Sequence, residues 1–232
     1  KRGIANAKFQ IGRIQSDNKQ TNKSIQTTYE AIALYRELGD SLKIADCYNN
    51  IGVIYATTGN YVWAVAELFK AINIYEKLNV PLIVINGYAN IGTINKILGN
   101  LELSKFYYEK SLNLAKGKLE FLPEFAGIYL NLGKLNYELK DYAQSELMYG
   151  KALKCLVHNP AEYLTATIYN SKAENAIVNQ KYKRAFKYLY SAKNTFETID
   201  SDNGLVEVLI NLGKCYLKTN HLAHAEKYIV QS

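Results

Sequence analysis

An eight-residue pattern recurs six times along the chain, at intervals of 40 or 41 residues. A catalytic motif is normally needed once, whereas a unit that stacks on copies of itself is needed many times. The pattern therefore predicts an array of stacked structural units. The copies are YNNIGVIY (48–55), YANIGTIN (88–95), YLNLGKLN (129–136) and LINLGKCY (209–216), with looser copies KFQIGRIQ (8–15) and YNSKAENA (169–176).

Each copy has the periodicity of an amphipathic helix. In residues 48–55 the apolar side chains gather on one side of such a helix, and Asn49, Asn50 and Val53 fall on the other. A glycine stands inside the apolar stripe, although glycine costs about 1 kcal/mol relative to alanine there. We expect close approach of a neighbouring helix to offset this cost. The glycines are Gly12, Gly52, Gly92, Gly133 and Gly213, and Ala173 takes the place in the fifth copy.

A short polar turn and a second helix are predicted after each copy. Small residues recur 12 and 19 positions after the glycine, and this seven-residue separation places both on one helix face. We expect these small side chains to let neighbouring helices pack closely. They are Ser24, Ala64, Ser104, Ser145, Ala185 and Ala225, then Ala31, Ala71, Ser111, Ala152, Ala192 and Ser232.

These features resemble the tetratricopeptide repeat. In the second unit the matching residues are Tyr48, Ile51, Gly52, Tyr55, Gly59, Tyr61, Ala64 and Ala71. The resemblance implies an all-α, right-handed superhelical solenoid of antiparallel helix pairs. The fifth unit departs from the pattern, because Lys172 and Ala173 stand where Leu-Gly is expected. Each unit is about six residues longer than the common repeat of about 34, which we expect to lengthen the second helix and the turn after it.

The resemblance covers the whole chain as a single array of six units. The last unit is incomplete and has no polar cap, so we expect further repeats or another domain beyond this sequence, and possible dimers through the terminal repeats. The predicted units are 5–44, 45–84, 85–125, 126–165, 166–205 and 206–232.

The charge balance favours some partners over others. The net charge is +7, from 28 basic and 21 acidic residues, which gives a mild preference for acidic partners. Basic residues cluster at the start of the chain and in KYKRAFK (181–187). Such clusters form either solvated faces or nucleic-acid patches, and we favour solvated faces with no direct nucleic-acid binding.

No enzyme signature is present. The sequence lacks a glycine-rich phosphate loop, H-E-x-x-H and G-x-S-x-G. His221 and His224 have a spacing compatible with a metal but no evident third ligand. We therefore expect a non-enzymatic protein with no cofactor and no metal.

The three cysteines and the apolar runs bear on the compartment. Cys47, Cys155 and Cys215 stand at apolar positions, so we expect buried free thiols and favour the cytoplasm. A periplasmic location stays open if a signal peptide precedes Lys1. No apolar run reaches the roughly 18 residues that a membrane span needs.

The resemblance places ligand binding in the concave groove, which the first helix of each unit lines. The residue two before the glycine is usually asparagine, whose amide can pair with any extended backbone. This asparagine ladder is either a peptide-binding device or a structural feature of the repeat, and the sequence does not decide between them. Basic residues after several glycines favour an acidic or C-terminal carboxylate ligand, although a chaperone-type carboxylate clamp lacks its lysines. The candidate groove residues are Asn49, Asn50, Asn90, Asn131, Asn211, Arg13, Lys96, Lys134, Tyr137 and Lys214.

The predicted function is recognition of a protein or peptide. Stretches such as ELGDSLKIADCYNNIG (37–52) and YEKSLNLAKGK (108–118) resemble the tetratricopeptide regions of bacterial signalling proteins. This resemblance implies a sensory or regulatory module that acts on an output domain in the same chain. A stand-alone adaptor that assembles protein complexes, or a receptor for secreted peptide pheromones, are the alternatives.

Overall fold

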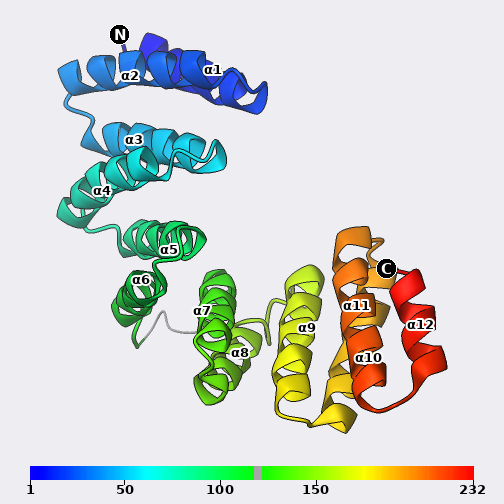
Figure 1. The fold of residues 1–232 in the computed structure, drawn as a ribbon. Coiled ribbons are helices and arrows are strands. Elements are labelled where there is room, and N and C mark those ends of the chain that lie inside the picture. Colours follow the sequence, from blue (N-terminus) through cyan, green and yellow to red (C-terminus); the bar gives the residue numbers. More distant parts are fainter. Residues whose placement is uncertain (118–121) are drawn as a thin grey trace. The chain divides into compact units, whose positions relative to one another are not determined.

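A computed structural model describes residues 1–117 and 122–232. The described residues form twelve α-helices and one short 3-10 helix, in two compact units, Lys1–Lys116 and Gly117–Ser232 (Figure 1). The all-α helix-pair fold predicted from the repeat is thus confirmed. The elements are α1 (Arg2–Asp17), α2 (Thr21–Glu37), α3 (Ser41–Thr57), α4 (Tyr61–Lys77), α5 (Pro81–Ile97), α6 (Leu101–Leu114), η1 (Pro123–Phe125), α7 (Ala126–Glu138), α8 (Tyr142–Cys155), α9 (Glu162–Val178), α10 (Tyr182–Thr198), α11 (Asp202–Lys218) and α12 (Leu222–Val230).

One three-residue turn is used both inside the hairpins and between them. In the turn after α3, Gly59 has φ +78° and the Asn60 amide donates to the Tyr55 carbonyl at 2.8 Å. The turn after α4 repeats this closure with Asn79 at φ +54° and the Val80 amide on the Tyr75 carbonyl at 3.2 Å. This hydrogen bond satisfies a helix-terminal carbonyl and fixes the chain reversal.

In the repeat formed by α3 and α4, the extra residues therefore lie in the helices and not in the turn. Helices α3 and α4 are both 17 residues long, so the predicted lengthening of the second helix and its exit turn is only half correct. The turn keeps its length because its hydrogen bonds define it. The predicted boundaries 44/45 and 84/85 are also displaced, since α3 begins at Ser41 and α5 at Pro81. The repeated octet lies in the middle of its helix, and the first turn of that helix precedes the boundary that we predicted. The predicted boundaries 165/166 and 205/206 fall inside α9 and α11 in the same way.

The glycines mark the closest approach within each hairpin, as predicted. A Cβ added at Gly52 would lie 2.8 Å from Leu68 Cγ, and one at Gly133 would lie within 2.6 Å of Tyr149 Cδ1. The small residues Ala64 and Ala71 of α4 are buried at 0 and 1% exposure. Small side chains on both helices thus allow the close packing that offsets the cost of glycine.

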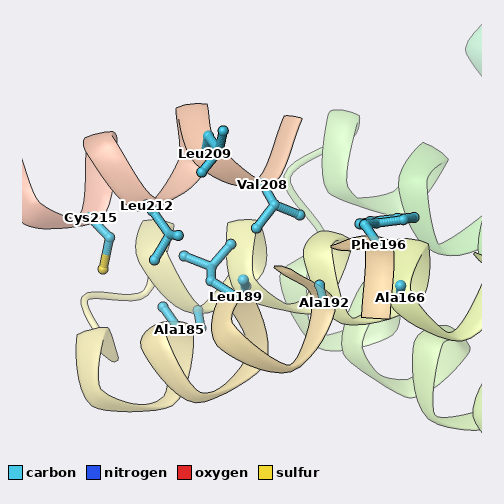
Figure 2. Packing of buried hydrophobic residues seen from close by; sticks show 11 residues of the cluster. Ala166, Ala185, Leu189, Ala192, Phe196, Val208, Leu209, Leu212 and Cys215 are labelled. Atoms are coloured by element: carbon cyan, nitrogen blue, oxygen red, sulfur yellow. The ribbon is translucent and has the colours of Figure 1, made fainter. Parts of the chain in front are cut away.

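Each hydrophobic core joins consecutive helices. In the first unit, one cluster includes Ala5 of α1, Tyr35 of α2 and Ile51 of α3. In the compact unit Gly117–Ser232, Leu189 of α10 points toward Val208 and Leu212 of α11 (Figure 2). A single hairpin cannot bury its apolar face, and the next helix completes the burial. Within the described residues, no helix combines the length and apolarity needed to cross a membrane.

Candidate functional site

The predicted amide ladder falls into different environments. Asn90 on α5 is exposed, whereas Asn49 and Asn50 on α3 and Asn131 on α7 are half-buried. Asn211 on α11 is only 3% exposed. Equivalent positions in the repeat therefore do not offer the same surface to a ligand.

An apolar pocket of about 230 Å³ lies between α3 and α5. Val53 and Thr93, the residues directly after two of the repeat glycines, line it together with Asn90. Val53 and Ile97 remain 41 and 58% exposed, so apolar surface faces solvent inside a hollow. Such a pocket suits an apolar side chain of a ligand. The lining residues are Val53, Ala56, Thr57, Tyr61, Leu68, Asn90, Thr93, Ile94 and Ile97.

The polar groups of this pocket differ in their availability. Thr93 donates to the Ala89 carbonyl at 3.1 Å, and its hydroxyl lies 2.8 Å from that of Tyr108. The exposed Asn90 side chain makes no hydrogen bond that is seen among residues 1–117 and 122–232. Its amide can donate to and accept from an extended backbone beside the pocket.

The Asn50 amide on α3 is a second polar group without a hydrogen-bond partner in the part of the chain that the structure describes. The Asn50 Nδ2 atom is buried and makes no hydrogen bond within the described part of the chain. The equivalent residue on α11 is Asn211, which donates to Asn170 and Glu174 of α9. These two residues stand three before and one after Ala173, the residue at the glycine position of α9. On α1 these two positions hold Phe9 and Arg13, which offer no side-chain acceptor. The α1–α3 seam therefore leaves the Asn50 amide unsatisfied.

Asn211 is part of a hydrogen-bond network on α9 and α11. Its Nδ2 donates to Asn170 Oδ1 at 3.0 Å and to Glu174 Oε1 at 3.2 Å. Lys214 Nζ donates to Asn211 Oδ1 at 3.2 Å, and Asn170 Nδ2 donates to Glu207 Oε2 at 3.4 Å. Two predicted groove residues, Asn211 and Lys214, are thus engaged with groups of the chain itself.

The remaining candidates occupy varied positions. Arg13 on α1 is exposed, whereas Lys96 on α5 and Lys134 on α7 are half-buried. Tyr137 on α7 packs its ring 5.5 Å from that of Tyr142, and burial raises its pKa. It therefore stays neutral at physiological pH and can contribute only a hydroxyl and a ring.

The histidines and cysteines have structural surroundings. His224 stacks on Tyr216 at 5.0 Å between ring centroids, and in residues 1–117 and 122–232 no three metal-ligating side chains gather. Cys47, Cys155 and Cys215 are all buried, as predicted, and form no disulfide with one another. Burial raises the pKa of Cys47 to about 12 and that of Cys215 to about 11. These thiols are therefore poor nucleophiles.

Sequence reasoning missed two parts of the surface. Ala56 and Ile97 line the pocket but lie about one helical turn after Val53 and Thr93, outside the octets, so only their apolar character there could have indicated them. Lys172 was read as a degenerate repeat position, although it is 7% exposed and pairs with Glu146. The signal in the sequence was a lysine directly before the glycine position, where the other repeats have isoleucine or leucine.

Comparison with known families agrees with the repeat geometry. A tetratricopeptide repeat model matches residues 85–118 and 126–154, and a second model of the same description matches 44–81. The chain is a tetratricopeptide repeat protein. No curated protein sequence matches it significantly.

Solved structures share this tetratricopeptide repeat fold. BtubC from P. vanneervenii is 17% identical with a TM-score of 0.78, over 95% of this chain and 89% of that one. Aspartyl phosphate phosphatase F from Bacillus subtilis is 15% identical with a TM-score of 0.73, over 98% of this chain and 58% of that one. A signal transduction ATPase with a tetratricopeptide repeat sensor, from Pyrococcus horikoshii, is 22% identical with a TM-score of 0.82, over 98% of this chain and 35% of that one. At these identities the likeness concerns the fold alone.

Proposed function

We propose that this tetratricopeptide repeat protein binds an extended peptide across α3 and α5, without catalysis, as the regulatory module of a bacterial signalling protein. The observation that carries the proposal is the apolar pocket of about 230 Å³ beside the exposed Asn90, whose amide has no hydrogen-bond partner among the described residues. Val53 and Ile97 are exposed apolar side chains, and both lie in the lining of this pocket. An apolar side chain of the peptide fills this pocket.

The Asn90 amide supplies the second element of recognition. It hydrogen-bonds the peptide backbone next to the buried side chain, which fixes the direction of the chain without reading its sequence. The pocket and the Asn90 amide thus contribute most of the binding energy, as a few residues usually do at protein interfaces.

The regulatory role rests on fold likeness and on the style of the repeats. One protein of similar fold carries the tetratricopeptide repeats as the sensor of a signal transduction ATPase. An adaptor or a receptor for a secreted peptide would use the same pocket. The source of the bound peptide separates these roles: an output domain in the same chain, another intracellular protein, or the medium.

Selection from a random peptide library tests the proposal. Binding of selected peptides is followed by the fluorescence of Trp63, the single tryptophan, which lies two residues after the pocket residue Tyr61 and 6.4 Å from the Tyr55 ring. We expect Val53→Lys to abolish binding and Asn90→Ala to weaken it by about tenfold, the loss of one hydrogen bond.

Asn86→Ala is the matched control. Asn86 is also exposed on α5, one turn before Asn90, but does not line the pocket. Its replacement should leave the affinity unchanged. Selected peptides that bind Val53→Lys as well as the parent protein would refute this binding site.

A further inference from the structure

The fifth repeat breaks a column of buried apolar residues. The residue before the repeat glycine is apolar in the five other repeats. Ile51, Ile91 and Leu212 are 0% exposed and Leu132 is 4% exposed, whereas Ile11 on the terminal helix α1 is 46% exposed. Lys172 of α9 occupies the same position at 7% exposure. A buried ammonium group is costly unless it is paired. Its surroundings must therefore supply a compensating charge.

Glu146 of α8 supplies that charge. Its Oε1 lies 2.6 Å from Lys172 Nζ and 3.6 Å from Arg184 of α10. Its equivalent in the following hairpin is Phe186, which packs against the same core cluster as Leu212. An ion pair thus replaces an apolar pair at the seam between α8 and α9.

A polar cavity of about 280 Å³ lies beside this ion pair, between α8, α9 and α10. Lys172, Arg184, Lys181 and the single carboxylate of Glu146 line it together with the ring of Tyr188. The Arg184 Nε donates to the Tyr188 hydroxyl at 3.0 Å, and Lys172 Nζ lies 5.3 Å from the centre of that ring. Lys172 and Arg184 are therefore held by the Tyr188 ring as well as by Glu146.

The side-chain amides of α9 are turned toward protein groups. Asn175 Nδ2 donates to the Tyr142 carbonyl at 2.9 Å, and Asn179 Nδ2 donates to the Asn175 carbonyl at 2.8 Å. These bonds engage both amides with backbone carbonyls. The charged residues that line the cavity are three bases, Lys172, Lys181 and Arg184, and one acid, Glu146, so its lining carries more positive than negative charge.

We propose that this cavity binds an oxyanion, a carboxylate or phosphate group, at Arg184 and Lys181. Lys172 neutralises Glu146 in the interior, so the two outer cations retain donors that one carboxylate cannot saturate. The volume admits a single acidic group and its immediate attachment. The site lies wholly in the second unit and does not depend on the peptide pocket between α3 and α5.

Titration of the whole protein tests this site with two probes, inorganic phosphate and a short glutamate peptide. The readout is the nitrogen-15 NMR signal of Arg184 Nε and of the side-chain amides of Asn175 and Asn179, at constant ionic strength. A saturable shift with phosphate identifies a free oxyanion as ligand. A shift with the peptide alone identifies a carboxylate of a polypeptide. No saturable shift with either probe, or equal shifts with chloride, would overturn the proposal.

Three variants separate binding in this cavity from general attraction to a basic surface. Arg184→Ala should weaken binding about tenfold, because it removes a charge-assisted hydrogen bond. Glu146→Gln should tighten binding, because it removes the negative charge while keeping an acceptor for Lys172. Lys183→Ala removes an equal charge from α10 outside the cavity and should have no effect. Weakening by Lys183→Ala equal to that by Arg184→Ala, or weakening by Glu146→Gln, would show a general attraction to a basic surface and no site.

Discussion

Lys172 Nζ lies 2.6 Å from Glu146 Oε1, at positions that hold Ile91 and Val65 in one apolar cluster and Leu212 and Phe186 in another. The Lys172 side chain is 8% exposed and that of Glu146 is 34% exposed. Removing the carboxylate therefore leaves the more deeply buried charge without its main partner. Removing the ammonium leaves a carboxylate that water and Arg184 still reach.

This asymmetry predicts unequal effects of the two single substitutions. Glu146→Ala should lower the free energy of unfolding by about 3 kcal/mol, as expected for an uncompensated buried charge. Lys172→Leu should cost less, about 1 kcal/mol. The double variant Glu146→Val with Lys172→Leu should regain the parent stability or exceed it, because an apolar pair avoids desolvation. Urea unfolding followed by circular dichroism measures all four proteins, and purely additive losses would contradict the account.

Asn90 and Asn211 occupy equivalent repeat positions and should respond differently to alanine. Asn211→Ala leaves Asn170 and Glu174 short of a donor, so we expect a loss of about 1–2 kcal/mol in stability. Asn90→Ala should change stability by less than about 0.5 kcal/mol, since its side chain is exposed. The thermal unfolding midpoints of the two variants, measured side by side, test this. Equal losses would mean that both amides have the same structural role.

This pair shows how far the sequence predicts the site. Both residues fit one pattern, and the pattern located them correctly on the first helix of each unit. Their environments differ because Asn211 faces Asn170 and Glu174 on α9, while Asn90 stands beside a hollow next to Val53. That difference depends on side chains of another helix, about 40 residues away, which the local pattern does not specify.

The fold was more predictable than the site. The repeat spacing fixed the helix pairs, and small residues such as Ala64 and Ser145 proved to be buried at 0% exposure. Helix starts were less well predicted, because a cap such as Asp40, which accepts from the Lys43 amide, lies outside the apolar period. The cavity beside Lys172 was missed because a single charged residue in an apolar column resembles the decay of a repeat.

Two glycines in the same hairpin predict opposite effects of alanine. A Cβ at Gly133 of α7 would lie 2.4 Å from Tyr149 Cε1, and Tyr149 is 1% exposed and cannot move away. Gly133→Ala should therefore cost about 1–3 kcal/mol through overpacking. A Cβ at Gly150 of α8 meets nothing within 4 Å, so Gly150→Ala should gain up to about 1 kcal/mol of helix propensity. Denaturation midpoints measure both, and a stable Gly133→Ala would show that the hairpin is packed less tightly.

Buried tyrosines predict loss of the fold in alkaline solution. Burial raises the pKa of Tyr149 to about 12, and it also raises the pKa of Tyr35. In the unfolded chain these phenols ionise near pH 10. Their contribution to stability is therefore fully present below about pH 10 and is lost as the pH rises through about 12. Between these two values the phenols are ionised in the unfolded chain but still protonated in the folded protein, which favours unfolding.

A titration of tyrosinate absorbance together with far-ultraviolet circular dichroism checks this prediction. Of the 20 tyrosines, the exposed ones should ionise near pH 10 with the helices intact, and the buried ones should ionise only as the helical signal falls. Tyr149→Phe keeps the ring in place and removes one of the buried protons, so its helical signal should persist to higher pH. Complete ionisation near pH 10 with the helical signal unchanged would mean that water reaches these phenols in the folded protein, and that burial does not hold them neutral.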